Sequence, residues 1–143
     1  MKLILILIFS ALILSASQNP EHLRVQILEK VLSEISIDTE ILIWSDNKEI
    51  LSEIAQNKHF KTVQNCEDSN IIILEKESKL THKCADKHIF VLDYQLLQNL
   101  SKSFGALFWK KGRPNIIILE PKIKNQSITV SNALEPYLEE KIW

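Results

Sequence analysis

Three short, almost uninterrupted aliphatic runs constrain the fold of this chain more than any other feature of its sequence. They are Glu40–Trp44 (EILIW), Asn70–Leu74 (NIIIL) and His88–Leu92 (HIFVL). A strand that is apolar at nearly every position is expected to be buried on both faces, as strands are in a parallel sheet covered by helices. The runs therefore predict the central strands of such a sheet.

Amphipathic segments separate these runs. Apolar residues recur at helical spacing over Pro20–Ile35, Lys48–Gln56 and Tyr94–Leu100, which predicts a helix in each segment. Buried strands that alternate with helices are typical of an α/β fold, and the early strands should be parallel.

The pattern changes after residue 100. Two strand-like runs, Gly105–Trp109 and Pro114–Leu119, flank the turn Lys110–Arg113. Apolar runs on either side of a short glycine-containing turn predict a β-hairpin. We expect this hairpin to add antiparallel strands at one edge of the sheet.

Shorter elements complete the expected architecture. Phe60–Val63 alternates like an edge strand, and Pro121–Asn125 is expected to form one helical turn. A last helix is predicted over Ala133–Lys141, with Ser131 as its N-cap and Pro136 tolerated in its first turn. The sequence thus predicts a three-layer α/β sandwich, whose mixed, mostly parallel sheet carries a C-terminal β-hairpin and flanking helices.

Residues 1–17 have the features of a secretory signal peptide. A basic start at Lys2 precedes the apolar run Leu3–Leu14, and the small residues Ser15–Ser17 follow. The run is shorter than the roughly 20 residues that a membrane-spanning helix needs. We expect cleavage near Ser17, which leaves residues 18–143 as a single periplasmic domain. An uncleaved anchor is the alternative.

Cys66 and Cys84 are the two cysteines of the chain. An even pair in an exported protein predicts a disulfide, since the compartment is oxidising. A redox-responsive bridge is an alternative to a structural one. Metal or haem ligation with the nearby His82 and His88 is another, although the absence of a CxxCH motif excludes covalently attached c-type haem.

Composition and motifs argue against several classes of function. The formal net charge of -1 disfavours a nucleic-acid partner. The chain has only two glycines and neither GxGxxG nor GxxxxGK[ST], and it also lacks GxSxG and HExxH. Asp46 and Asp93 follow buried strands, where α/β folds place ligand sites, but both are expected to cap helices. We therefore expect no catalytic residues, no metal and no cofactor.

The hairpin carries the most distinctive chemistry. Trp109, Lys110, Lys111 and Arg113 crowd one predicted turn. Tryptophan and arginine are enriched at binding hot spots, and the cations suit an acidic partner or a small anion. These four residues are the candidate partner-binding site. The alternative is a solvated turn with Trp109 packed inward.

Segments from two parts of the chain resemble the YfiR-like family. Residues 112–119 (GRPNIIIL) and 128–134 (ITVSNAL) are similar to the closing segment of that family, in which a Gly-Arg turn leads into a strand, a short helix and an aliphatic-x-aliphatic-Ser step. Residues 66–73 (CEDSNIII) resemble its cysteine before a buried strand. The order of elements from the first helix onward is also similar, so the resemblance covers most of residues 18–143.

The resemblance implies a small periplasmic regulator without catalytic activity. Relatives bind the periplasmic part of a membrane signalling protein, such as a diguanylate cyclase or a sensor kinase, and their disulfides affect stability. Exposed sheet edges would also permit a homodimer.

Two other functions stay open. One is a small-solute-binding protein of a transport or sensing system, although a chain of this length forms a single lobe where such proteins usually close two. The other is a redox or metal protein built on Cys66, Cys84 and the nearby histidines.

Overall fold

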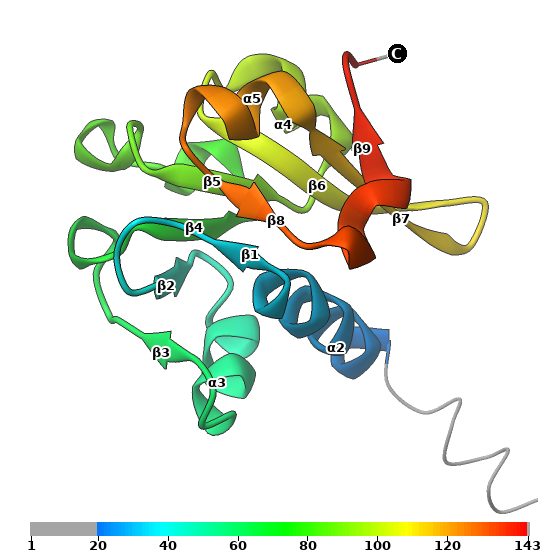
Figure 1. The fold of residues 1–143 in the computed structure, drawn as a ribbon. Coiled ribbons are helices and arrows are strands. Elements are labelled where there is room, and N and C mark those ends of the chain that lie inside the picture. The colour runs from blue at the N-terminus through cyan, green and yellow to red at the C-terminus, as the bar shows by residue number, and fades with distance from the viewer. Residues whose placement is uncertain (1–19, 143) are drawn as a thin grey trace, which may run out of the picture.

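The computed structural model describes residues 20–142, and a mixed seven-stranded sheet runs through the centre of this part of the chain (Figure 1). The strand order is β3-β2-β4-β5-β6-β7-β9. The strands are β2 (Leu42–Ser45), β3 (Lys61–Thr62), β4 (Ile71–Leu74), β5 (His88–Val91), β6 (Ser103–Lys110), β7 (Arg113–Leu119) and β9 (Leu138–Glu139). The strands from β3 to β6 are parallel, β7 is antiparallel to β6, and β9 is parallel to β7.

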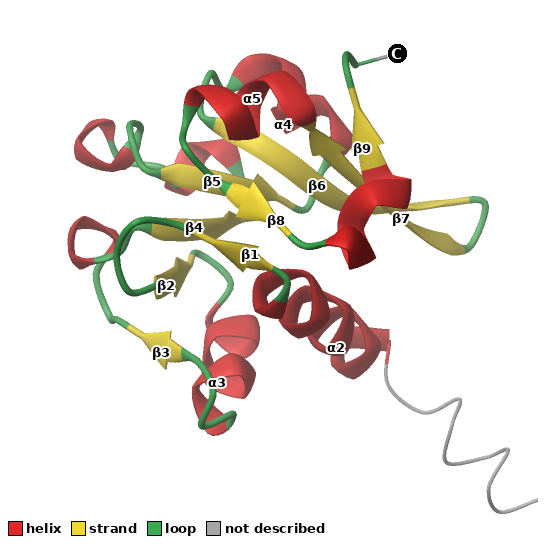
Figure 2. Ribbon diagram, in the orientation of Figure 1, coloured by secondary structure: helices red, strands yellow, loops and turns green. Residues whose placement is uncertain are grey.

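Helices cover the sheet, and a small second sheet lies beside it (Figure 2). The helices are α2 (Pro20–Ser33), α3 (Lys48–Gln56), α4 (Tyr94–Asn99) and α5 (Glu120–Asn125), joined by the 3₁₀ helices η1 (Cys66–Asp68), η2 (Glu77–Lys79), η3 (His82–Cys84) and η4 (Asn132–Tyr137). The second sheet pairs β1 (Ile35–Ser36) with β8 (Thr129–Val130) in antiparallel fashion. It joins the end of α2 to the segment that leads into η4.

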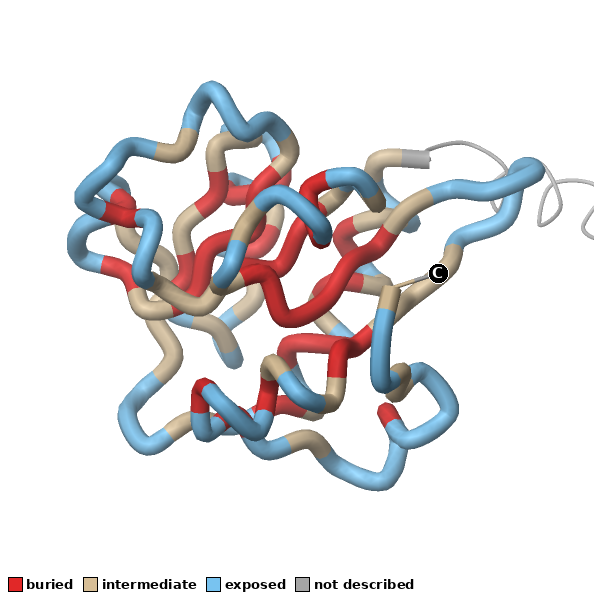
Figure 3. Tube along the Cα trace, turned by 90° about the horizontal axis from the view of Figure 1, so that it is seen from above, coloured by how far each residue is buried: buried red, intermediate tan, exposed pale blue. Residues whose placement is uncertain are grey.

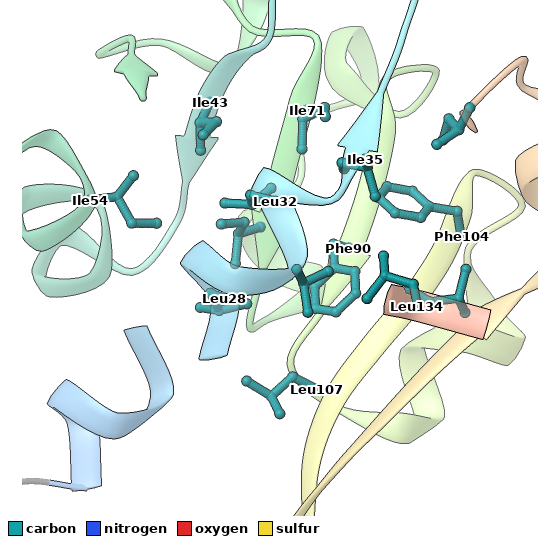
Figure 4. Packing of buried hydrophobic residues seen from close by; sticks show 14 of the residues in the cluster. Leu28, Leu32, Ile35, Ile43, Ile54, Ile71, Phe90, Phe104, Leu107 and Leu134 are labelled. Carbon is teal, nitrogen blue, oxygen red and sulfur yellow. The ribbon is translucent and has the colours of Figure 1, made fainter. Parts of the chain in front are cut away.

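Two apolar clusters occupy opposite faces of the central sheet. The first is formed by α2, α3, the C-terminal segment and one side of the strands, and Figure 4 shows Leu28, Phe90 and Leu134 among its members. The second contains both cysteines and the apolar residues of α4. All four residues of β4 are buried, as the aliphatic runs predict. Successive side chains of a strand point to opposite faces, and each face of β4 is covered by one of the two clusters. Figure 3 shows the buried segments running through the middle of the molecule.

The observed elements confirm the predicted α/β sandwich. The three aliphatic runs become β2, β4 and β5, and Phe60–Val63 contains the short parallel edge strand β3. Helix α3 begins and ends at the predicted residues, and the Asn47 side chain caps it by accepting the backbone N–H of Ile50. The predicted signal peptide, residues 1–17, lies outside the described residues.

The predicted last helix over Ala133–Lys141 is wrong. The 3₁₀ helix η4 ends at Tyr137, and the chain then extends into β9. Pro136 explains the difference, since it lies inside η4, lacks an N–H, and its ring clashes with an α-helical turn before it. Ser131 does act as the N-cap, because its hydroxyl accepts the N–H of Ala133.

The hairpin also sits differently in the sheet from the prediction. The first hairpin strand, β6, is parallel to β5 and continues the parallel series, so the direction of the strands reverses only between β6 and β7. Strand β9 lies outside β7, so the hairpin does not form the edge of the sheet along its whole length.

Gly105 of β6 lies where the neighbouring strands β5 and β7 leave no room for a side chain. A Cβ atom at this position would lie 2.8 Å from the carbonyl oxygen of Ile117 and 2.9 Å from the Phe90 ring. We expect Gly105→Ala to lower the free energy of unfolding by about 1–3 kcal/mol, as overpacking in a core does. Urea denaturation measures this difference.

Gly112→Asn is the matched control. Gly112 has a φ of +75° and open space around it, and asparagine tolerates this left-handed conformation. Equal loss of stability in the two variants would contradict the close packing of Gly105.

Candidate functional site

The β6–β7 hairpin protrudes from the body of the protein (Figure 1). Its two-residue turn consists of Lys111 and Gly112, with φ values of 53° and 75°. Positive φ at both central residues is the geometry of a type I′ turn, whose twist matches that of the flanking strands. Ser103 at the start of β6 is buried and Lys110 at its end is exposed, so the turn of the hairpin lies in solvent (Figure 3).

The structure brings the four predicted contact residues together at this tip. Lys110, Lys111 and Arg113 are exposed, and within residues 20–142 no carboxylate forms an ion pair with any of them. Trp109 lies opposite Pro114 and is 39% exposed. Three cations that form no ion pair within the described residues therefore share one small surface with a large exposed ring, and we call this surface the hairpin tip.

An apolar groove adjoins the hairpin. It has a volume of about 310 Å³ and lies between α2, β7 and η4. Its apolar lining is Ile27, Val31, Ile116, Ala133, Leu134 and Tyr137. Polar residues at its rim include Lys30 and Glu34, which form an ion pair with each other at 3.4 Å. We refer to this feature as the apolar groove.

Contacts between distant parts of the chain build this groove. The Ser131 N–H donates to the carbonyl oxygen of Glu34 at 2.9 Å, and the Ser131 hydroxyl donates to the Glu34 carboxylate. Leu134 is buried in the first core cluster and anchors η4. These contacts hold η4 against α2, so one wall of the groove comes from each end of the described chain.

The hydroxyl of Ser131 also affects the charge at the groove. Its hydrogen bond, together with the nearby Lys30 ammonium, lowers the pKa of Glu34 below the ordinary value of 4.5, against a smaller opposing effect of burial. The carboxylate is therefore the form that the folded protein favours.

The face of the sheet that lines the groove at Ile116 continues toward the hairpin tip. Leu107 and its cross-strand partner Ile116 belong to the face of the sheet that α2 covers. Trp109 is two residues beyond Leu107, so its side chain is on the same face. The large exposed hydrophobic residues of the described chain are Leu23, Trp109 and Tyr137. Leu23 is one helical turn before Ile27, and Tyr137 lines the groove. Trp109 is paired with Pro114 of β7, the strand that contributes Ile116 to the groove.

Sequence reasoning missed the groove. The helical periodicity over Pro20–Ile35 includes Leu23 and Ile27, and Tyr137 falls in the predicted last helix. Leu23 is 45% exposed although Val25, two residues later, is buried, and an apolar residue outside the core-facing side of α2 was the available signal.

The acidic residues at the carboxyl ends of the strands hold loops together. Asp46 was expected to cap a helix, but its carboxylate oxygens accept the backbone N–H groups of Glu75 (2.8 Å) and Lys76 (3.0 Å), and Asn47 is the cap. Asp93 does cap α4, because its side chain accepts the N–H of Gln95. A hollow of about 540 Å³ lies nearby, between the half-buried Trp44 and the outer side of α3.

Cys66 and Cys84 form a disulfide, as predicted. It links η1 to η3, the two turns that precede β4 and β5, across a Cα–Cα distance of 6.1 Å. Cys66 is 8% exposed and Cys84 is fully buried. The His88 Nδ1–H donates to the Gln126 side-chain oxygen at 2.8 Å, and within residues 20–142 no group of three metal-ligating side chains is close enough to hold an ion.

Comparison with known proteins leaves the family open. No protein-family model matches the chain, and a search of curated proteins returns no match. The resemblance to the YfiR-like family therefore stays a hypothesis. Among residues 20–142, no helix combines the length and the apolar composition that crossing a bilayer requires.

Removal of the disulfide should destabilise the fold. A bridge between residues 18 apart in sequence restricts the unfolded chain, so Cys66→Ser/Cys84→Ser is expected to lose about 3 kcal/mol of unfolding free energy. Denaturant unfolding measures the loss, and a reductant should lower the stability of the wild-type protein to the same level. A reductant effect on the double variant itself would mean that the loss has another origin.

The hydrogen bond between Ser131 and Glu34 should make stability depend on pH. Because the pKa of Glu34 is lower in the folded than in the unfolded chain, its stabilising contribution is complete above pH 4.5 and disappears as the pH falls through the folded-state pKa. NMR titration of Ser131→Ala should show the pKa of Glu34 moving back up toward 4.5. Glu34→Gln should remove this part of the acid dependence, and an unchanged Glu34 pKa in Ser131→Ala would contradict the assignment.

Proposed function

We propose that the protein is an exported, non-catalytic regulator that binds the periplasmic part of a membrane signalling protein, such as a diguanylate cyclase or a sensor kinase. The hairpin tip is the observation that carries this proposal. It presents Trp109 and three cations on a protruding turn, without an intramolecular ion pair among the described residues.

The chemistry of the tip suits protein recognition. A tryptophan that loses its remaining exposure in a complex contributes a large apolar area, and arginine adds directional hydrogen bonds to carboxylates. Both residue types are over-represented among the few that dominate binding energy. The cations also favour an acidic partner and accelerate the encounter with it. A rigid two-residue turn keeps these groups in one place, which limits the entropy lost on binding.

Two further features support the proposal. The sequence of residues 1–17 has the pattern of an export signal. The Cys66–Cys84 disulfide is of the kind that persists in oxidising compartments such as the periplasm. The resemblance to the YfiR-like family provides the class of partner.

Photo-cross-linking in living cells tests the proposal. With a photoreactive amino acid in place of Trp109, we expect a cross-link to a membrane signalling protein, and one in place of the distant, exposed Lys58 should give none. Trp109→Ala is then expected to weaken binding to the periplasmic domain of that protein by about 2 kcal/mol, roughly thirtyfold, in a calorimetric titration. Failure to recover any membrane signalling protein, with normal signalling after gene deletion, would contradict the proposal.

A small-solute-binding function is the second candidate. The hollow beside Trp44 favours it, since an aromatic side chain and the polar groups of Ser45 and Lys48 line it at the carboxyl end of β2. Ligands of open α/β sheets bind at that end of the strands. A rise in melting temperature with one member of a metabolite panel, abolished by Trp44→Ala, would support this function.

A further inference from the structure

Resting on the proposed function, we propose that the apolar groove receives a short peptide segment of the partner protein. This segment is apolar where it enters the groove between α2, β7 and η4, and acidic where it passes the hairpin tip. The proposed function requires only that the tip contacts a partner, whereas this inference adds a second contact and the chemistry of what fills it.

The distribution of apolar surface indicates where the segment lies. The large hydrophobic residues that the described chain leaves exposed are Leu23 at 45%, Trp109 at 39% and Tyr137 at 38%. Tyr137 lines the groove, Leu23 is one helical turn before the lining residue Ile27, and Trp109 is paired with Pro114, two residues from the lining residue Ile116. Scattered single residues of this kind are ordinary on a protein surface, but a gathering around one concave site is typical of an interaction site. The volume of about 310 Å³ has room for a few apolar side chains.

Charge determines one end of the segment. At the rim of the groove, Lys30 and Glu34 neutralise each other, so the groove itself does not select for a charged ligand. At the tip, Lys110, Lys111 and Arg113 have no such partner within residues 20–142. A bound segment that runs along β7 from the groove to the tip therefore passes from an apolar surface to a cationic one. Acidic residues next to an apolar run are the complement of that surface.

The walls of the groove are firm enough to select a ligand. The β1–β8 pairing and the two hydrogen bonds between Ser131 and Glu34 fix η4 against α2. Leu134 is buried beneath the groove and anchors its floor. A preformed groove loses little conformational entropy when it is filled.

The first experiment uses a synthetic peptide as the probe. The peptide has a run of leucines followed by glutamates at one end, and it is titrated into the purified, isotope-labelled protein. We expect NMR shift changes at the amides of Val31, Ile116 and Tyr137, together with those of the hairpin tip. Leu23→Asp should weaken binding at least about tenfold, and because Leu23 is exposed this variant should keep its melting temperature.

A charge exchange provides the matched control. Lys110→Glu/Arg113→Glu should lose the glutamate peptide and gain a peptide that carries lysines in place of the glutamates. Lys58→Glu changes the same kind of charge at an exposed position after α3 and should leave both affinities unchanged. Recovery of binding by the exchange cannot come from misfolding.

Several outcomes would overturn the inference. Shift changes at the Trp44 hollow in place of the groove would do so, as would equal affinity for the glutamate and lysine peptides. A groove covered by a second copy of the chain, seen as a dimer that Leu23→Asp dissociates and that excludes the peptide, would also refute it. If Trp109→Ala weakens binding to the cross-linked membrane protein while Leu23→Asp does not, the proposed function stands and this inference fails.

Discussion

Burial of β4 on both of its faces is the constraint from which the rest of the architecture follows. Its four residues, Ile71–Leu74, have no exposed surface, and alternate side chains point to opposite sides. Each side therefore needs an apolar cover, and the two core clusters provide it. Helices α2 and α3 lie on one face, while α4 and the disulfide-linked turns lie on the other. The disulfide thus secures the turns that complete the second cover, where the helical contribution is smallest.

The hairpin is the place where this cover ends. Strand β6 has eight residues and its parallel neighbour β5 has four, so the far half of β6 extends past the sheet with only β7 beside it. Burial accordingly decreases along this half, from Leu107 in the first core cluster to the exposed Trp109 and Lys110. Trp109 remains partly in solvent for this reason, and the cations at the tip keep the protruding end hydrated. The candidate contact surface is a geometric result of two strands that are longer than their neighbours.

Most strands and helices could be predicted from the local sequence, but the apolar groove could not. The aliphatic runs predicted β2, β4 and β5, because burial on both faces requires apolar residues at every position. Pro136 should have argued against the last helix, since its effect on an α-helical turn is local. The contact between Glu34 and Ser131 joins residues 97 apart, and no periodicity in either segment encodes it. The tip residues could be predicted because they are adjacent in sequence, whereas the groove is assembled from three separate segments.

The pairing of β1 with β8 has a consequence for the order of folding. Ile35 lies opposite Val130, so the strand that follows the first helix of the described chain is paired with residues close to its last ones. Contacts between such distant residues form slowly, because a long loop must close first. The pairing of α2 with the rest of the chain through β1 therefore waits for the C-terminal segment, and the contact that shapes the groove is expected to form late in folding.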